Sequence, residues 1–281
     1  MYRKILILIF LVTVLYFLNS CFINNTFTKG FSIAQYTKTH GPALEKIKSA
    51  TVYFRNKNRR WSGIAISPDG KVLTACHGVV GSKNMPYIKY DKSIEKYEIA
   101  LRGRYGDKEF EHVKVVSVFP ELDLAIVDIG LPTESYLTGS TTGPKEEDLV
   151  FLTGISTHNA QISSGKYFAC SDASGWKKAA SIWVDGPAFK GDSGGAIVNE
   201  KGELLGIMTN NVDPKELLAL IKTQKEVFAG RNYIIIATAV PPQVITAVLN
   251  SKTRLNFSAT KGNVEKDWGA ISLTEPTDSK L

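Results

Sequence analysis

Short apolar runs alternate with turn residues along most of the chain, from about residue 50 to about residue 240. The clearest case is a hairpin in which Gly63–Ile66 leads into Ser67-Pro68-Asp69-Gly70 and Lys71–Thr74 returns. Proline presets the first dihedral of such a turn, and glycine accepts its last position. Strands at this spacing predict an all-β barrel or sandwich and not alternating α/β units.

The predicted strands form two groups joined by a linker. Residues 131–147 are rich in Pro, Thr, Ser and Gly, which is typical of a connecting segment. We therefore place one β unit at about 48–130, a second at about 148–240, and a C-terminal tail at 251–281.

Three helices are predicted beside the strands. Pro42 would open a helix over 43–48, and Pro242 would open another that ends at Leu249. Apolar residues at helical spacing predict a third within 213–230, which we interpret as a surface insertion in the second unit.

The amino terminus differs from the rest of the chain. Arg3 and Lys4 precede an apolar run from Ile5 to Leu18, which is the pattern of an export signal and is shorter than the roughly 20 residues of a bilayer span. Leu18-Asn19-Ser20-Cys21 is similar to a bacterial lipobox, so Cys21 is a candidate lipidation site. An uncleaved signal-anchor and ordinary cleavage are the alternatives. All three predict a protein outside the cytoplasm, membrane-tethered or secreted, with residues 22–42 as a tether.

Charge adds little to this interpretation. The formal net charge is +7, but basic residues lie among acidic ones except in a cluster of Arg55, Lys57, Arg59 and Arg60. We interpret the cluster as a solvated hairpin loop in preference to a lipid or polyanion contact. No nucleic-acid-binding pattern is present, so nucleic acid is not an expected partner.

Cysteines are few. Only Cys76 and Cys170 follow Cys21, which excludes a disulfide-dense scaffold and leaves a single bridge open. Cys76 directly precedes His77, but neighbours on a strand point to opposite faces and cannot readily pair as nucleophile and base. We interpret Cys76 as a small core residue.

A histidine and a serine stand out as candidate catalytic residues. His77 ends the predicted strand Val72–Cys76, and functional residues concentrate at strand ends. Glycines flank Ser193 in Lys190-Gly191-Asp192-Ser193-Gly194-Gly195, and their backbone freedom lets two amides converge on a substrate carbonyl. The pattern predicts Ser193 as nucleophile and His77 as general base. The backbone of Gly191, Asp192 and Ser193 would form the oxyanion hole, with the amides of Gly191 and Ser193 as donors.

Two aspartates compete to orient the histidine. Asp123 enters the apolar strand Leu124–Val127, where a carboxylate is costly unless paired, and a histidine N–H is a suitable partner. Asp128 lies an odd number of residues further on and would face the opposite side. We therefore assign the role to Asp123 and expect an exposed Asp128.

These motifs resemble a known family. Thr74-Ala75-Cys76-His77, Asp123–Val127 and Gly191–Gly195 occur in the order His, Asp, Ser of chymotrypsin-like proteases. Gly63–Gly70, Ile162-Ser163-Ser164-Gly165 and Ala196–Ile207 are similar to the protease domain of the bacterial HtrA/Deg family, over roughly 43–250. The resemblance implies two perpendicular six-stranded antiparallel β-barrels of the chymotrypsin fold with the active site between them. It also implies an ATP-independent serine endopeptidase without cofactor or metal.

The chain departs from that family in three respects. Too few residues follow Asn250 for a PDZ domain, so PDZ-mediated peptide sensing is not expected. Asp192 stands where Deg proteins usually have asparagine, and its partner is open. The segments 83–96 and 213–230 are longer than the minimal domain needs. By resemblance, an uncharged specificity pocket for a small or aliphatic residue is expected from Pro187, Ala188, Met208, Thr209 and Asn210.

The sequence thus predicts an extracytoplasmic serine endopeptidase that cleaves proteins or peptides, including unfolded ones, through an acyl-enzyme. The alternative is a protease-fold protein that is catalytically silent or latent and binds peptides or a partner. The oligomeric state is left open.

Overall fold

The computed structural model describes residues 36–56, 59–82, 85–86, 98–120, 122–155, 161–172, 180–211, 218–219, 222, 231, 234–250, 256–258 and 272–274. The predicted signal segment and Cys21 lie outside the described residues. The same holds for nearly all of the predicted helix within 213–230 and for the side chains of Cys170 and Asn210.

The first barrel is closed by six antiparallel strands in the order β1-β2-β3-β8-β7-β6. Its hairpin β2–β3 pairs Gly63 with Thr74 and Ala65 with Val72, and the turn between them is the one predicted from sequence. The strands are β1 (Thr51–Asn56), β2 (Arg59–Ala65), β3 (Lys71–Ala75), β6 (Glu98–Tyr105), β7 (Lys108–Phe119) and β8 (Leu124–Asp128). A separate short hairpin pairs β4 (Gly81–Ser82) with β5 (Met85–Pro86).

The second barrel is also closed and six-stranded, in the order β10-β11-β14-β13-β12-β9. All of its pairings are antiparallel. Its strands are β9 (Leu149–Gly154), β10 (Gln161–Asp172), β11 (Ala180–Asp185), β12 (Ala196–Val198), β13 (Leu204–Asn211) and β14 (Ile234–Ala239). A further two-stranded sheet joins β15 (Asn256–Ser258) to β16 (Ser272–Thr274).

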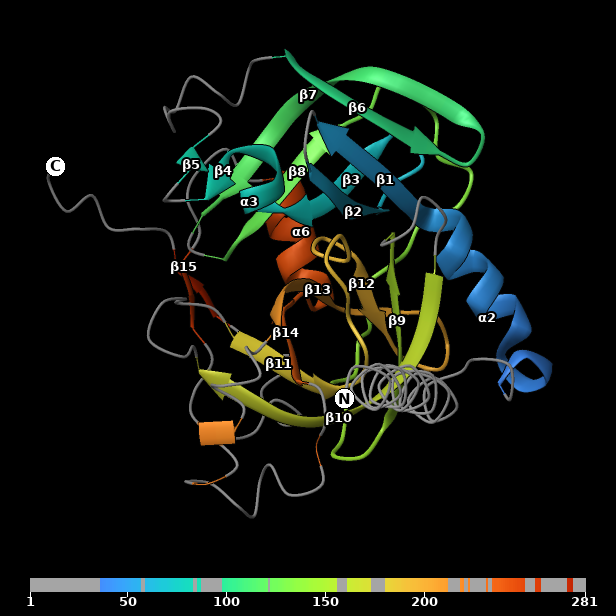
Figure 1. Cartoon of the computed structure of the whole chain (residues 1–281), viewed down its shortest axis with the longest axis vertical. Coiled ribbons are helices and arrows are strands. Elements are labelled where there is room, and N and C mark those ends of the chain that lie inside the picture. The colour runs from blue at the N-terminus through green and yellow to red at the C-terminus, as the bar shows by residue number, and fades with distance from the viewer. Residues whose placement is uncertain are drawn as a thin grey trace, which may run out of the picture.

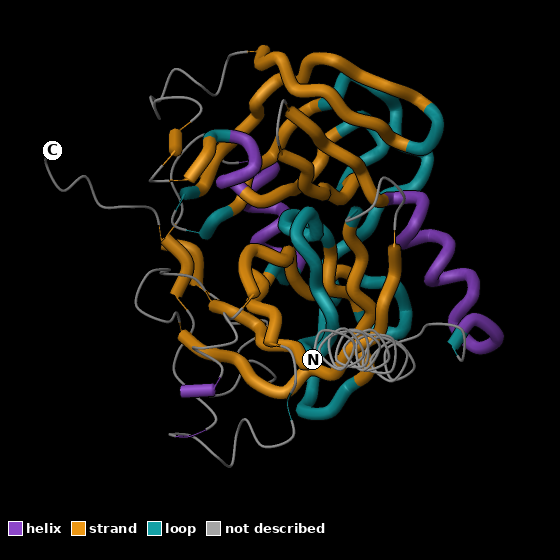
Figure 2. Tube along the Cα trace, in the orientation of Figure 1, coloured by secondary structure: helices purple, strands orange, loops and turns teal. Residues whose placement is uncertain are grey.

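The barrels lie one above the other in Figure 1, and strands dominate the trace in Figure 2. The fold class predicted from sequence, two six-stranded antiparallel barrels with short helices, is confirmed. Among the described residues, no helix has the length and apolar character needed to cross a membrane.

One hydrophobic core is shared by both barrels. It joins Ile64, Leu73 and Leu124 of the first barrel to Phe151 and Ile207 of the second. A second core fills the first barrel, where Phe54 and Trp61 stack with ring centroids 5.7 Å apart. Because the shared core contains residues from both β units, the two barrels are packed as one body.

Helix α2 (Thr37–Ala50) precedes the first strand and is longer than the predicted 43–48. Its residues Leu44, Ile47 and Ala50 enter the shared core. The additional first turns pack on the second barrel, because the His40 ring lies 5.6 Å from the Phe151 ring and 3.4 Å from the Glu200 carboxylate. These contacts are tertiary, which explains why the local pattern around Pro42 misplaced the helix start. His40 therefore belongs to a packed helix and not to a tether.

Helix α6 (Pro242–Asn250) follows the last strand of the second barrel and agrees with the predicted 242–249. Its Val244, Ile245 and Val248 enter the shared core. The linker also packs closely: Leu137 is fully buried, its amide donates to the Ala65 carbonyl, and the Ser140 amide donates to the Leu204 carbonyl. The linker is thus bonded to both barrels.

Candidate active site

His77 lies in a one-turn helix, α3 (Cys76–Val79), directly after β3. The strand ends where the chain turns, as the sequence predicted, but Cys76 belongs to the turn and is buried. A side chain at Gly78 would meet the Trp61 ring at 2.5 Å, so the glycine lets this turn lie against the core of the first barrel. The His77 side chain is 31 % exposed and can reach a substrate.

Asp123 holds His77 from the loop between β7 and β8. Its Oδ2 lies 2.9 Å from His77 Nδ1, its Oδ1 accepts the His77 backbone N–H at 3.0 Å, and its carbonyl accepts the Cys76 N–H at 3.0 Å. The residue has a positive φ of 53°, a conformation in which aspartate is enriched. These contacts satisfy amides at the start of α3 and fix the imidazole ring at the same time.

Asp128, the competing carboxylate, faces elsewhere. Its Oδ2 lies 3.0 Å from Lys71 Nζ and its Oδ1 accepts the Gly130 N–H at 2.9 Å. The structure has Asp123 at His77, as predicted, but strand alternation is not the reason, because Asp123 lies before β8 in a positive-φ conformation. Asp128 was expected to be exposed and is instead half-buried, because it pairs with Lys71.

Ser193 follows a tight turn in the second barrel. The Asp192 N–H donates to the Phe189 carbonyl at 3.0 Å, and Gly191 has φ +114° at the third position of this turn, as a type II turn requires. After the serine, the Gly194 N–H donates to the Met208 carbonyl at 2.7 Å and the Gly195 N–H to the Asp192 carbonyl at 2.8 Å. Among the described residues, none accepts a hydrogen bond from the amide of Gly191 or of Ser193.

Glycine is required at two positions in this loop. A Cβ on Gly194, where φ is +84°, would lie 2.0 Å from the Ser62 carbonyl oxygen and 2.5 Å from Thr74 Oγ1. A Cβ on Gly195 would lie 1.9 Å from the Thr153 carbonyl oxygen. The loop therefore lies against β2 and the end of β3, where Thr74 is three residues before His77 in the sequence.

The Ser193 side chain is half-buried, and none of the hydrogen bonds among the described residues joins it to His77. Catalytic hydrogen bonds are often long in structures without substrate. The Ser193 backbone, in contrast, is fixed, because its carbonyl accepts the Ser62 N–H at 2.8 Å.

Asp192 is buried beneath the loop. Its Oδ2 accepts the Phe189 N–H at 2.8 Å, whereas its Oδ1 has no hydrogen-bond partner among the described residues. A Cβ on Gly154 would lie 2.3 Å from this Oδ1, so the carboxylate packs directly on the end of β9. Burial raises the pKa of the Asp192 carboxyl to about 6, and the hydrogen bond from Phe189 opposes the increase.

The predicted specificity residues lie beside this loop. Met208 and Thr209 are buried on β13, where the Met208 carbonyl and amide both bond to the serine loop. Pro187 and Ala188 are half-buried between β11 and the turn. The sequence did not single out Phe189, whose side chain is 60 % exposed at the turn itself. The exposure of this ring depends on the tertiary structure, and no local sequence pattern predicts it.

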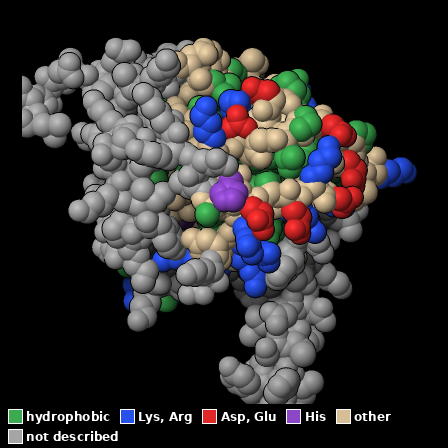
Figure 3. All heavy atoms as spheres, turned by 90° about the horizontal axis from the view of Figure 1, so that it is seen from above, with side chains coloured by type: hydrophobic (Ala, Val, Ile, Leu, Met, Phe, Trp, Pro, Cys, Tyr) green, Lys and Arg blue, Asp and Glu red, His purple; other side chains and the backbone are tan. Residues whose placement is uncertain are grey.

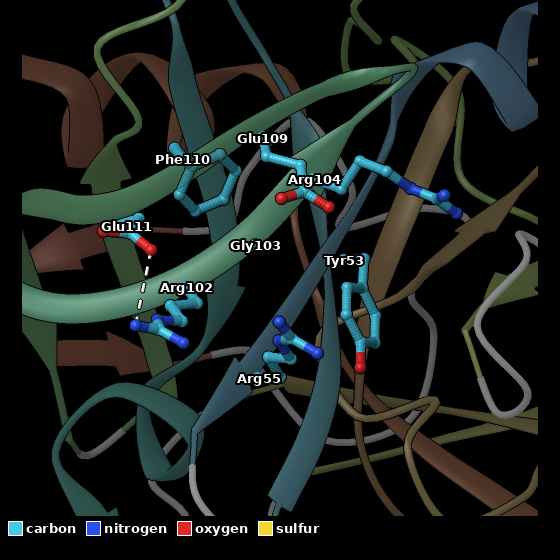
Figure 4. A pocket seen from close by; sticks show the side chains of 8 residues that line it. All are labelled: Tyr53, Arg55, Arg102, Gly103, Arg104, Glu109, Phe110 and Glu111. Carbon is cyan, nitrogen blue, oxygen red and sulfur yellow. Dashed lines mark ion pairs between the residues drawn. The ribbon is translucent and has the colours of Figure 1, made fainter.

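A pocket lies on the outer face of the first barrel, formed by residues of β1, β6 and β7 (Figure 4). Two of its arginines face acidic residues: Arg102 lies 3.3 Å from Glu111, and Arg104 is opposite Glu109 in the strand register. The third, Arg55, is opposite Arg102. Basic and acidic side chains also alternate over the face seen in Figure 3. The described part of the chain contains no cluster of three or more His, Cys, Asp or Glu residues able to hold a metal ion.

Comparison with known proteins agrees with this geometry. A family model for the trypsin-like peptidase domain matches residues 61–207, from β2 through the histidine and serine loops to β13. The chain belongs to the trypsin-like peptidase family. It is therefore a protease of the serine class. No curated protein matched the sequence.

Solved structures share the fold of this trypsin-like peptidase at low identity. The HtrA-type protease AlgW with a tripeptide has a TM-score of 0.59 and 18% identity over 86% of this chain and 77% of its own. The active form of the Rv3671c protease from M. tuberculosis has a TM-score of 0.53 and 18% identity over 86% and 88%. A serine endoprotease from Yersinia pestis has a TM-score of 0.53 and 19% identity over 76% and 66%.

Proposed function

We propose that this trypsin-like peptidase is an endopeptidase that acts through Ser193, His77 and Asp123. The observation that carries the proposal is the double contact of Asp123 with His77. The glycine-flanked loop of Ser193 supports it, because this loop packs on the end of β3, the strand that leads into His77. An Nδ1–H donated to the carboxylate leaves Nε2 of His77 unprotonated and able to accept a proton.

Each step then has a group to perform it. His77 Nε2 takes the proton of the Ser193 hydroxyl while Oγ attacks the scissile carbonyl carbon, and Asp123 stabilises the imidazolium that forms. The amides of Gly191 and Ser193 donate to the oxyanion, whereas the Asp192 amide is already used by Phe189. The imidazolium returns its proton to the leaving amine, and a water activated by His77 hydrolyses the acyl-enzyme.

The substrate class proposed is protein or peptide, because the fold is shared with HtrA-type proteases, one of them solved with a tripeptide. Pro187, Ala188, Met208, Thr209 and Asn210 would line an uncharged specificity pocket, and the exposed Phe189 would offer it an apolar rim. The basic and apolar amino terminus supports a location outside the cytoplasm, with Cys21 as a lipidation site if the segment is processed there.

Replacing the nucleophile tests the proposal. Ser193→Ala should abolish cleavage of an unfolded protein and labelling by a fluorophosphonate probe, with an unchanged melting temperature. Ser67→Ala, on a half-buried serine of the turn between β2 and β3, is the matched control and should be labelled like the wild type. Degradation by Ser193→Ala at the wild-type rate would refute the proposal.

A latent protease is the second candidate, favoured by the unpartnered Oδ1 of Asp192 below the serine loop. A latent enzyme would label weakly when purified and strongly once an activating partner or membrane is added. A catalytically silent binding protein would not label in either condition, although it would retain peptides.

A further inference from the structure

Ser62 is a polar residue of the first barrel that bonds to the second. It lies on β2 and is fully buried. Its N–H donates to the Ser193 carbonyl at 2.8 Å, and its hydroxyl donates to the Gly191 carbonyl at 2.9 Å. The same hydroxyl accepts the Ile155 N–H at 2.8 Å, and its carbonyl accepts the Thr74 hydroxyl at 2.6 Å. Four hydrogen bonds therefore converge on one serine.

These bonds fix the peptide groups around the nucleophile. The carbonyl and the N–H of a trans peptide point in opposite directions, so anchoring a carbonyl sets the orientation of its peptide plane. Ser62 anchors the Gly191 carbonyl, whose plane carries the Asp192 N–H. It also anchors the Ser193 carbonyl, whose plane carries the Gly194 N–H. The Asp192 carbonyl, whose plane carries the Ser193 N–H of the oxyanion site, is anchored by Gly195. Ser62 therefore fixes the two peptides on either side of the one that bears the Ser193 donor. Three consecutive carbonyls are thus bonded to the protein.

The loop needs such anchors because of its glycines. Gly191, at φ +114°, has a wide choice of alternative backbone conformations, since it lacks a Cβ. Rotation about its bonds would turn the Gly191 and Ser193 amides away from a common point. An oxyanion site stabilises charge only when its donors are held in place before the reaction.

We infer that Ser62 is a positioning residue whose hydroxyl holds the turn at Phe189–Asp192, and with it the oxyanion donors, in the reactive conformation. The inference rests on the proposed function and deepens it. The hydroxyl is suited to this role because it is donor and acceptor at once, which lets it join Gly191 of the serine turn to Ile155 at the end of β9. The Asp192 side chain packs on Gly154, the residue before Ile155. The Ser62 hydroxyl and the Asp192 carboxylate therefore both connect the serine turn to the end of β9.

Ser62→Ala removes both side-chain hydrogen bonds and leaves the backbone bond to Ser193 in place. We expect fluorophosphonate labelling and kcat to fall about tenfold, less than the hundred- to thousandfold that loss of a direct oxyanion donor costs, with KM nearly unchanged. Hydrogen exchange of a peptide covering 189–195 should accelerate at the same time, because the turn opens more often.

Ser140→Ala is the matched control. Ser140 is also fully buried, and its hydroxyl is also both donor and acceptor. It lies 2.9 Å from the Thr142 carbonyl, 3.1 Å from Glu203 Oε2 and 3.1 Å from Asn199 Nδ2, but it belongs to the linker. The Ser140→Ala variant should lose stability, as should Ser62→Ala. Its fluorophosphonate labelling and its hydrogen exchange at 189–195 should stay at wild-type values.

The outcomes separate the two proposals. Wild-type exchange at 189–195 in Ser62→Ala, or faster exchange with wild-type labelling, would overturn the positioning role. If no form is labelled, the wild type included, the proposed peptidase activity fails. Faster exchange in Ser62→Ala would in that case still support the anchoring of the turn.

Discussion

Asp123 shows how much a single carboxylate does in this site. One oxygen holds the histidine backbone and the other its ring, so the residue fixes both the position and the rotation of the imidazole. Its side chain is 16 % exposed, which keeps its hydrogen bond to His77 partly shielded from water.

Asp123→Asn should lower kcat about ten-thousandfold, because an amide that donates to Nδ1 would favour the wrong histidine tautomer. The change can be measured by steady-state cleavage of a fluorogenic peptide. Asp128→Asn is the control, since Asp128 pairs with Lys71 at 3.0 Å and does not contact His77. Comparable losses in both variants would contradict the assignment of Asp123.

Asp192 carries an energetic cost at neutral pH. Its pKa of about 6 in the folded protein lies above the ordinary value of 3.8, so the folded state binds the proton more tightly than the unfolded state. Stability should therefore fall as the pH rises from about 4 to about 6, by about 3 kcal/mol at 1.36 kcal/mol per pKa unit.

Asp192→Asn should remove this dependence. An amide oxygen can still accept the Phe189 N–H, and no charge is then buried, so the variant should gain up to about 3 kcal/mol at pH 8 and little at pH 4. Urea unfolding at both pH values measures the difference. An equal change in stability at the two pH values would mean that the carboxyl does not titrate in this range.

Among the elements, α2 was predicted from the sequence in its second half, whereas its start was placed too late. Pro42 predicted a helix over 43–48 before the first strand, and Leu44 and Ile47 of this helix enter the shared core. The earlier turns depend on His40 and Phe151, which are far apart in the sequence, so no local pattern could predict them. The catalytic motifs were predictable because each is local, whereas Ser62 acts only through bonds to residues about 100 positions away or more.

Ile47→Ala should destabilise the protein by about 2–5 kcal/mol, since a fully buried side chain leaves a cavity. Chemical denaturation measures the loss. Lys46→Ala, on the exposed face of the same helix, should change stability by less than about 0.5 kcal/mol. A small loss from Ile47→Ala would show that α2 contributes little to the folded domain.

At the scale of the molecule, the site depends on the way two barrels are joined. His77 and Asp123 come from the first barrel and Ser193 from the second, and the shared core and Ser62 hold the two in register. The apolar runs between turn residues, together with the linker, predicted the two β units. The family resemblance predicted that each unit closes into a barrel. Neither predicted the hydrogen bonds between the barrels.

The linker has a consequence for engineering the protein. Residues near Leu137 and Ser140 bond to both barrels, yet the segment around Lys145 to Glu147 is more exposed. A chain cut there would give two fragments, one with the base and one with the nucleophile, neither able to cleave a peptide. Proteolysis would return only when the fragments reassemble, so each could be fused to one of two interacting proteins and the regained activity would report that they have met.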